Sequence, residues 1–185
     1  MIRAAIVGIG TWGRNLVTSV QGSEDIRFVA GATQTPAKAA DFCRQHGIRL
    51  VESYERLLGA REVDAVVLAT PVCRGSRTGV LKNLLDDVPV TVLERTPAGI
   101  TAMRATQHHY LGAERHLRDV LAFFGALVAP VAVYLTGAEF DDGRPIGAAD
   151  RDLNALLAKM VGLARAVGCR SHDGPQPLAA GGARR

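Results

Sequence analysis

The sequence is poor in cysteine and aromatic residues and has no long apolar run. Cys43, Cys73 and Cys169 lie far apart and form no CxxC pair, so neither a disulfide framework nor a zinc site is indicated. We expect three reduced thiols, of which at least two are packed in the interior. No apolar run reaches the roughly 18 residues of a membrane helix, and the start of the chain lacks the order of a signal peptide. A cytoplasmic protein without a membrane partner is expected.

A concentration of basic residues is also missing. The net charge is +4 and the pI is about 9.3, but the 22 lysines and arginines are scattered along the chain. Nucleic acid is therefore not expected as a partner. The chain does have core-forming residues, because 48% of its 185 residues are hydrophobic and only 22% are charged. This composition suits one globular domain.

Apolar runs alternate with helical stretches along most of the chain. Runs rich in β-branched and small apolar residues predict buried parallel strands at 3–9, 26–32, 63–69, 98–103 and 131–135. Helices are expected at 12–21, 36–46, 53–58, 78–86, 110–124 and 148–167. The last of these carries Leu153, Leu156, Leu157, Met160 and Leu163 at a spacing that predicts a packing stripe.

Strict alternation of strand and helix predicts an α/β fold. The expected architecture is a three-layer αβα sandwich around a doubly wound parallel sheet. Residues 1–168 would form this single domain. Residues 169–185 contain Gly, Pro and Ala without periodicity, which predicts a disordered tail.

A glycine-rich turn follows the first expected strand. In "GIGTWGRN", the G-x-G-x-x-G spacing comes directly before a helix. Such a turn allows close approach of a pyrophosphate to the backbone and to the helix N-terminus. A purely structural glycine turn is the alternative. The phosphate contacts would come from Gly8, Gly10, Thr11, Trp12, Gly13, Arg14 and Asn15.

The acidic residue that usually holds the ribose hydroxyls, about 20 positions later, is missing. The segment "GATQTPAK" offers Thr33 and Gln34 at this place, and neither Asp25 nor Asp41 fits. A neutral site with Lys38 nearby favours NADP, or weak binding of either NADP or NAD.

The first part of the chain resembles the Gfo/Idh/MocA oxidoreductase family. The resemblance is carried by "AAIVGIGTWGRNLV", "IRFVAGATQTPAKAADF", "HGIRLVESYERLL" and "VDAVVLATP". It covers residues 1 to about 71 and implies a Rossmann-like NAD(P)-binding half. The Glu-Lys-Pro motif and the substrate domain of that family do not follow, and "LERTP" at 93–97 has no lysine, so the role of that motif is not carried over.

Residues from about 67 to 168 resemble a different family, the NAD(P)H-dependent FMN reductases of the flavodoxin-like fold. The resemblance is carried by "ATPVCRGSRTGVLKNLLDDVP" and "AGITAMRATQHHYLGAERHLRDVLAFFGALVAPVAVYLTGAEFDDGRP". It implies FMN and NAD(P) as ligands. It also implies a homo-oligomer formed through "TGVLKNLLD". The alternative for Val80, Leu81, Leu84 and Leu85 is packing on the sheet of their own subunit.

In the FMN reductases, the loop after the third strand lies against the isoalloxazine ring. The matching residues are Thr70, Pro71, Val72, Cys73, Arg74, Gly75 and Ser76. A second loop, "RATQHHYLG", matches the segment beside the flavin and adds Thr106, Gln107, His108, His109 and Tyr110. For His108, His109 and Tyr110 a capped helix start is the alternative.

Departures from this family include Cys73 and Arg77 in place of tyrosines. Arg104 and Gln107 replace a small residue and an acidic one. The Ser/Thr-rich phosphate loop of the family is also missing, and "GIGTWGRN" stands in its place.

The sequence therefore predicts a composite joined within "DAVVLATP". One hypothesis is an oxidoreductase of the flavin reductase type. Hydride transfer between two rings needs stacking and orientation more than an acid or base, so no catalytic side chain is assigned. The alternatives are a non-catalytic NAD(P)-binding module and a scaffold without a tight ligand.

Overall fold

The computed structural model describes the chain except for residues 59, 61, 75, 105–109, 143 and 168–185. The expected tail at 169–185 and Cys169 therefore lie outside the described residues. The main strands are β1 Ile2–Val7, β2 Ile26–Ala32, β3 Arg49–Leu50, β4 Ala65–Pro71, β5 Pro97–Arg104, β6 Leu127–Val128 and β7 Val133–Thr136. The helices are α1 Thr11–Val20, α2 Pro36–Gln45, α3 Tyr54–Leu58, α4 Gly79–Asp87, α5 Tyr110–Phe123 and α6 Ala148–Val167.

In the described part of the chain, seven strands form one sheet in the order β3-β2-β1-β4-β5-β6, and β7 also pairs with β5. Every pairing in this sheet is parallel. The path β2-β1-β4-β5-β7 is the 2-1-3-4-5 order of flavodoxin-like folds. The prediction of an α/β fold with a parallel sheet is confirmed.

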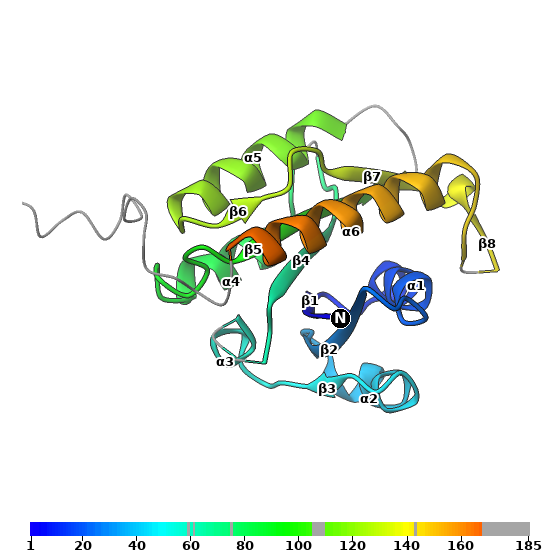
Figure 1. Cartoon of the computed structure of the whole chain (residues 1–185), viewed down its shortest axis with the longest axis horizontal. Coiled ribbons are helices and arrows are strands. Elements are labelled where there is room, and N and C mark those ends of the chain that lie inside the picture. Colours follow the sequence, from blue (N-terminus) through cyan, green and yellow to red (C-terminus); the bar gives the residue numbers. More distant parts are fainter. Residues whose placement is uncertain (59, 61, 75, 105–109, 143, 168–185) are drawn as a thin grey trace, which may run out of the picture.

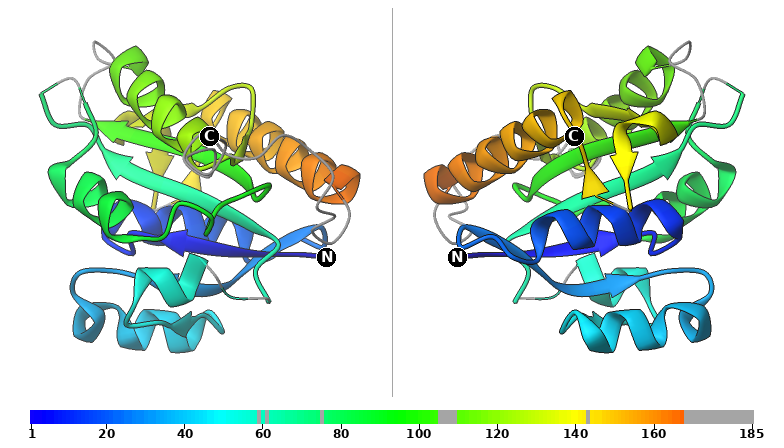
Figure 2. Two further views of the ribbon diagram at one scale, coloured as in Figure 1. Left: turned by 90° about the vertical axis from the view of Figure 1, so that its left-hand side faces the viewer. Right: turned by 90° about the vertical axis from the view of Figure 1, so that its right-hand side faces the viewer.

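Helices cover both faces of this sheet (Figure 1). Residues of α1, α2 and α6 share one buried cluster with the sheet, whereas those of α3, α4 and α5 share the other. Figure 2 shows α4 and α5 in front of the sheet in one view and α1 and α6 in front of it in the other. The expected three layers are therefore present.

Several predicted boundaries were wrong by about two residues. The first strand ends at Val7 rather than at residue 9, because Gly8 turns the chain with a φ of +96°. The third expected strand begins at Ala65 rather than 63, and the last begins at Val133 rather than 131. The short strands β3 and β6 were not predicted. Nor was the antiparallel hairpin of β8 (Phe140–Asp141) and β9 (Arg144–Pro145).

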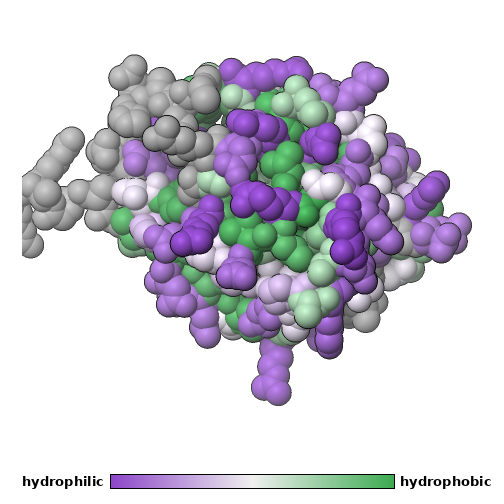
Figure 3. All heavy atoms as spheres, turned by 90° about the horizontal axis from the view of Figure 1, so that it is seen from below, coloured by the Kyte–Doolittle hydropathy of each residue, from purple (hydrophilic) through white to green (hydrophobic). Residues whose placement is uncertain are grey.

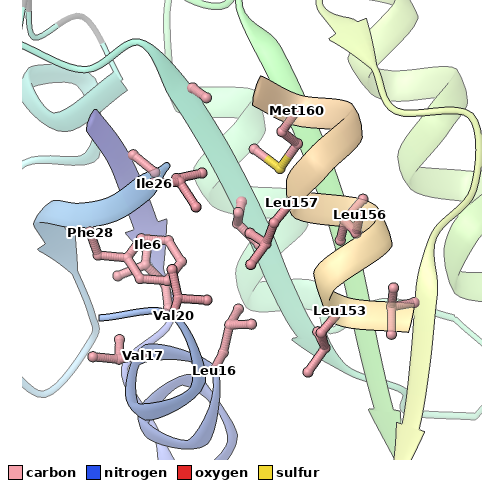
Figure 4. Packing of buried hydrophobic residues seen from close by; sticks show 14 of the residues in the cluster. Ile6, Leu16, Val17, Val20, Ile26, Phe28, Leu153, Leu156, Leu157 and Met160 are labelled. Carbon is pink, nitrogen blue, oxygen red and sulfur yellow. The ribbon is translucent and has the colours of Figure 1, made fainter. Parts of the chain in front are cut away.

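The predicted packing stripe of α6 lies on the sheet. Leu153, Leu156, Leu157 and Met160 are all buried, and Figure 4 shows them facing the sheet beside the side chains of α1. A Cβ atom at Gly99 of β5 would lie 2.5 Å from Sδ of Met160. Gly99 therefore lets α6 approach the sheet closely.

The surface is mixed in character. Hydrophilic side chains surround an apolar area on the face shown in Figure 3. Within the residues that the structure describes, no helix is both long and apolar enough to span a bilayer. Of the two described cysteines, Cys43 is buried and Cys73 is exposed.

An ion pair joins the start of β1 to the chain just before β4. The Asp64 carboxylate accepts hydrogen bonds from the Arg3 backbone N (2.9 Å), from Nε (3.1 Å) and from Nη2 (2.8 Å). Partial burial acts to raise the pKa of Asp64, but the hydrogen bonds and charge of Arg3 outweigh it and hold this pKa below its usual range. The pair thus fixes the relative position of the two central strands.

We expect Asp64→Asn to lower the free energy of unfolding by about 1 kcal/mol at neutral pH, because it weakens a half-exposed charged contact. The folded-state pKa of Asp64 is depressed, so its contribution is complete above the unfolded-state pKa and is lost as pH falls through the folded value. The difference between wild type and variant should shrink in acid. Urea unfolding at about pH 7 and about pH 3 measures it.

Asp86→Asn is the matched control, because Asp86 pairs with Lys82 on the exposed surface of α4. Its expected loss is only about 0.3–0.5 kcal/mol. A loss for Asp64→Asn that is equal at the two pH values would contradict the assignment.

Candidate site at the carboxyl edge of the sheet

The loops that leave the carboxyl ends of β1 and β4 lie next to each other. These strands are adjacent and parallel, with Val7 opposite Leu68. After β1 the chain adds β2 on one side of β1, whereas after β4 it adds β5 on the opposite side of the sheet. Such a change of direction is the switch point at which α/β proteins bind ligands.

The glycines of the turn after β1 allow a very close contact between that turn and α1. Gly8 has a φ of +96°, and its backbone N donates to the Ala32 carbonyl at 2.9 Å. A Cβ atom at Gly13 would lie only 1.9 Å from the carbonyl oxygen of Gly8. Residue 13 must therefore be glycine for α1 to begin where it does.

The N-terminus of α1 is open. Its N-cap residue, Gly10, makes no side-chain cap, and the first turn has no acidic residue. A Cβ atom at Gly10 would meet nothing within 4 Å. The first N–H groups of a helix lack intrahelical acceptors and carry partial positive charge. This geometry suits a phosphate group.

The direction of the Arg14 side chain does not favour its expected phosphate contact, whereas the expected contact of Asn15 stays a prediction. The Arg14 guanidinium donates to the Lys38 carbonyl and lies 5.2 Å from the centroid of the Phe42 ring. The Asn15 carbonyl accepts a hydrogen bond from the Ser19 hydroxyl. Arg14 is thus directed toward α2. The side chain of Trp12 lies outside the described residues.

The loop between β4 and α4, residues 72–78, is tied to its surroundings. The Val72 backbone N donates to the Met103 carbonyl of β5 at 2.9 Å. The backbones of Cys73 and Ser76 bond to each other in both directions, at 2.8 and 3.1 Å. Arg74 between them has a φ of +50°. This narrow turn presents the exposed side chains of Cys73 and Arg74.

Side chains hold the same loop at two further points. The Thr70 hydroxyl accepts a hydrogen bond from the Thr78 backbone N at 3.4 Å. Ser76 Oγ lies 2.8 Å from Nδ1 of His116 on α5. The loop is therefore attached both to the end of β4 and to α5.

Two arginines at this edge have buried nitrogen atoms for which the described residues provide no acceptor. Nε of Arg77, in the 72–78 loop, and Nη1 of Arg104, the last residue of β5, find no hydrogen-bond partner within the described part of the chain. Buried polar groups are almost always paired in native proteins. An anionic ligand group entering here would supply the missing acceptors.

The remaining expected site residues divide into two groups. Thr33 and Gln34 line a pocket at the end of β2 together with Gly8 and Pro71. Gly75, Thr106, Gln107, His108 and His109 lie outside the described residues, and so does the side chain of Tyr110. Their contacts stay predictions.

Sequence reasoning missed some residues of this edge. Arg77 and Arg104 were noted only as departures from a family pattern, and nothing singled out His116, which is forty positions from Ser76. Thr78, whose side chain caps α4, could have been found, because a threonine before an apolar helical stretch is a start signal.

The comparisons with known proteins agree with this architecture. A family model described as NADPH-dependent FMN reductase matches residues 45–140. An "FMN reductase (NADPH)" of Pseudomonas aeruginosa is 38% identical over 81 residues, which are 44% of this chain and 44% of the relative. The chain thus spans about half the length of the curated relatives that it matches. The family model begins after the glycine turn.

Solved structures show the same fold at low sequence identity. An oxidoreductase of Corynebacterium diphtheriae has a TM-score of 0.62 and 20% identity over 90% of this chain and 98% of its own. An archaeal flavodoxin has a TM-score of 0.55 and 10% identity over 90% and 99% of the two chains. Since the family model spans more than half of the sequence, this chain, with its flavodoxin-like fold, belongs to the NADPH-dependent FMN reductase family.

Proposed function

We propose that the protein is an NAD(P)H-dependent oxidoreductase that reduces flavin, with FMN bound at the carboxyl edge of the sheet. The observation that carries this proposal is that an open helix N-terminus lies at the same edge as arginine donors that have no partner among the described residues. The first suits a phosphate, and the second suits an electron-rich ring edge. Family membership supports the same ligand.

In this proposal, the FMN phosphate lies on the N-terminus of α1, next to Gly10. The isoalloxazine ring lies against residues 70–76, whose turn is held by the contact with His116. The second loop, from Thr106 to Tyr110, would complete the ring site. These residues orient the ring rather than react with it.

Bound flavin supplies the redox chemistry by accepting hydride from the nicotinamide of NAD(P)H. The chain contributes stacking surfaces and fixed geometry, which is how proteins accelerate transfer between two bound rings. Arg77 and Arg104 would balance the negative charge that the ring gains. No side chain is required as an acid or base.

We propose further that residues 1–71 are a dinucleotide-binding half of the Gfo/Idh/MocA type, joined to a flavodoxin-like half at 72–168. The strand order β3-β2-β1-β4 supports this division, since β3 occupies the outer place that a Rossmann half adds. The glycine turn supports it too. If the join has destroyed the flavin site, an NAD(P)-binding module is the function that is left.

A cytoplasmic homo-oligomer completes the proposal. On α4, Leu81, Leu84 and Leu85 are buried, whereas Val80 is 44% exposed. The three leucines thus pack on the sheet of their own subunit, which is the alternative that the sequence left open beside an oligomer contact. Val80 is left as an apolar side chain that a second subunit could cover.

Gly10→Val tests the phosphate site. The space around Gly10 is open, so folding should be unaffected, but the new side chain would cover the N–H groups of α1. We expect the Kd for FMN to rise by about tenfold or more, the cost of a charged hydrogen bond. Gly22→Val is the control, because a Cβ atom there also meets nothing within 4 Å. Equal FMN affinities in the two variants, measured by fluorescence quenching, would refute this placement.

Arg77→Leu tests the unpaired arginine donors. We expect kcat/KM for FMN reduction to fall by about tenfold, because a charged contact to the ring is lost. Stability should be unchanged or slightly higher, since the variant removes a buried donor that has no acceptor among the residues the structure describes. Steady-state kinetics and urea unfolding measure the two effects. Arg151→Leu, on the exposed face of α6, should alter neither, and a loss of stability without a loss of activity in Arg77→Leu would contradict the assignment.

A further inference from the structure

Helix α6 carries a stripe of small and charged residues on a side that is open to solvent. In Figure 1, α6 runs along the front of the molecule, and no other described element lies in front of it. Exposed residues recur along this helix at intervals of four and three, namely Ala148, Asp152, Ala155, Lys159, Gly162 and Ala166. We call these residues the α6 stripe. Their intervals place all of them on one side of the helix, over a length of about 27 Å.

The α6 stripe forms one wall of a groove of about 310 Å³. Asp152, Ala155 and Lys159 line this groove from α6, and residues 129–134 line it from the other side. Val131, on that other side, is 69% exposed, the highest value among the large apolar side chains of the described part of the chain. The groove is therefore mostly apolar and has one acidic and one basic residue at its rim, as protein interfaces do.

Gly162 of the stripe is not needed for packing within the subunit. A Cβ atom at this position would meet nothing within 4 Å, and glycine destabilises the interior of a helix by about 1 kcal/mol relative to alanine. Ala155 and Ala148 precede it at intervals of seven, so a small residue stands at every second place of the stripe. Small side chains let two helix axes approach closely. The stripe thus suits a second helix better than it suits solvent, toward which helices usually turn charged and polar side chains.

The two charges of the stripe can pair only between two molecules. Asp152 and Lys159 are about 10 Å apart along the helix axis, too far for an ion pair within α6. Neither belongs to an ion pair among the described residues, whereas Lys82 and Asp86, which are closer in the sequence of α4, do pair. If a second α6 lay antiparallel to the first, with a two-fold axis near Ala155, each Asp152 would face the Lys159 of the other helix. Two-fold interfaces are self-complementary in this way.

We propose that the α6 stripe is an interface with a second copy of this chain, in which two α6 helices pack antiparallel and each lies along the groove of the other. Ala155 lies at the crossing point, and the partner helix covers Val131. The two Asp152–Lys159 pairs fix the antiparallel direction, because a parallel pair of helices would set like charges opposite each other.

This interface is separate from the α4 surface considered above. Residues of α6 and α4 belong to the buried clusters on opposite faces of the sheet. The α6 stripe also contains none of the residues placed around the flavin. The inference therefore goes beyond the proposed function and does not depend on flavin binding.

The test follows self-association by sedimentation velocity over a range of micromolar concentrations. It compares the wild type, Asp152→Lys, Lys159→Asp and the double variant that exchanges the two charges. Asp41→Lys is the matched control, because it makes the same charge change on the exposed surface of α2, at the other end of the sheet. Val80→Asp probes association through α4. Both α6 positions are exposed, so the variants should fold, which circular dichroism checks.

We expect the wild type to form a dimer. Each single variant should raise the dimer Kd by about tenfold or more, because the two-fold symmetry turns both attractive pairs into like-charge pairs. The double variant restores opposite charges and should return the Kd to within about threefold of the wild-type value. Asp41→Lys should leave the Kd unchanged, and Val80→Asp should leave this dimer intact.

A wild type that stays monomeric over the whole concentration range overturns the inference. So does a dimer that Asp152→Lys and Lys159→Asp leave intact, or one that Val80→Asp dissociates, since association would then use α4. A double variant that associates no better than the single ones refutes the antiparallel pairing of the charges. None of these outcomes involves FMN binding, so this inference and the flavin reductase proposal fail separately.

Discussion

The contact between Gly13 and the Gly8 carbonyl is the constraint on which the site depends. A Cβ atom at position 13 would lie 1.9 Å from that oxygen, so any side chain would push α1 away from the end of β1. With glycine, the first turn of α1 stands directly above the carboxyl edge of the sheet. The positive end of the helix then faces the place where strands on both sides of β1 end.

This placement gives the glycine turn two neighbours. On one side lies the β4–α4 loop, which Val72 ties to β5 and Ser76 ties to α5. On the other side lies the pocket at the end of β2. A single candidate anion site thus stands between the candidate ring site and this pocket, and residues from both halves of the sequence line the pocket.

Much of the fold could be predicted from the sequence because its main elements are long and periodic. The helix at 148–167 and the strand at 26–32 were placed without error. β3 and β6 were missed because two residues carry no period, and only pairing with β2 and β5 makes them strands. The glycine spacing predicted the turn. The pocket beside it, however, is lined by residues from β1, the β2–α2 connection, α3, β4 and α4, and these come together only through the packing of α3 and α4. Nor could the sequence show that nitrogen atoms of Arg77 and Arg104 are buried without an acceptor in the described part of the chain, because burial depends on tertiary packing and not on a local pattern.

The outer strands of the sheet also decide how copies of the protein meet in a crowded solution. At one edge of the sheet, β3 pairs with β2 through Arg49 and Leu50 alone. The opposite edge consists of two short strands, β6 and β7, which residues 129–132 separate. Long, flat and unpaired borders recruit strands from other molecules and begin aggregation. Here each border offers a short or broken row of free backbone groups. The sheet is thereby protected from growing beyond its own chain.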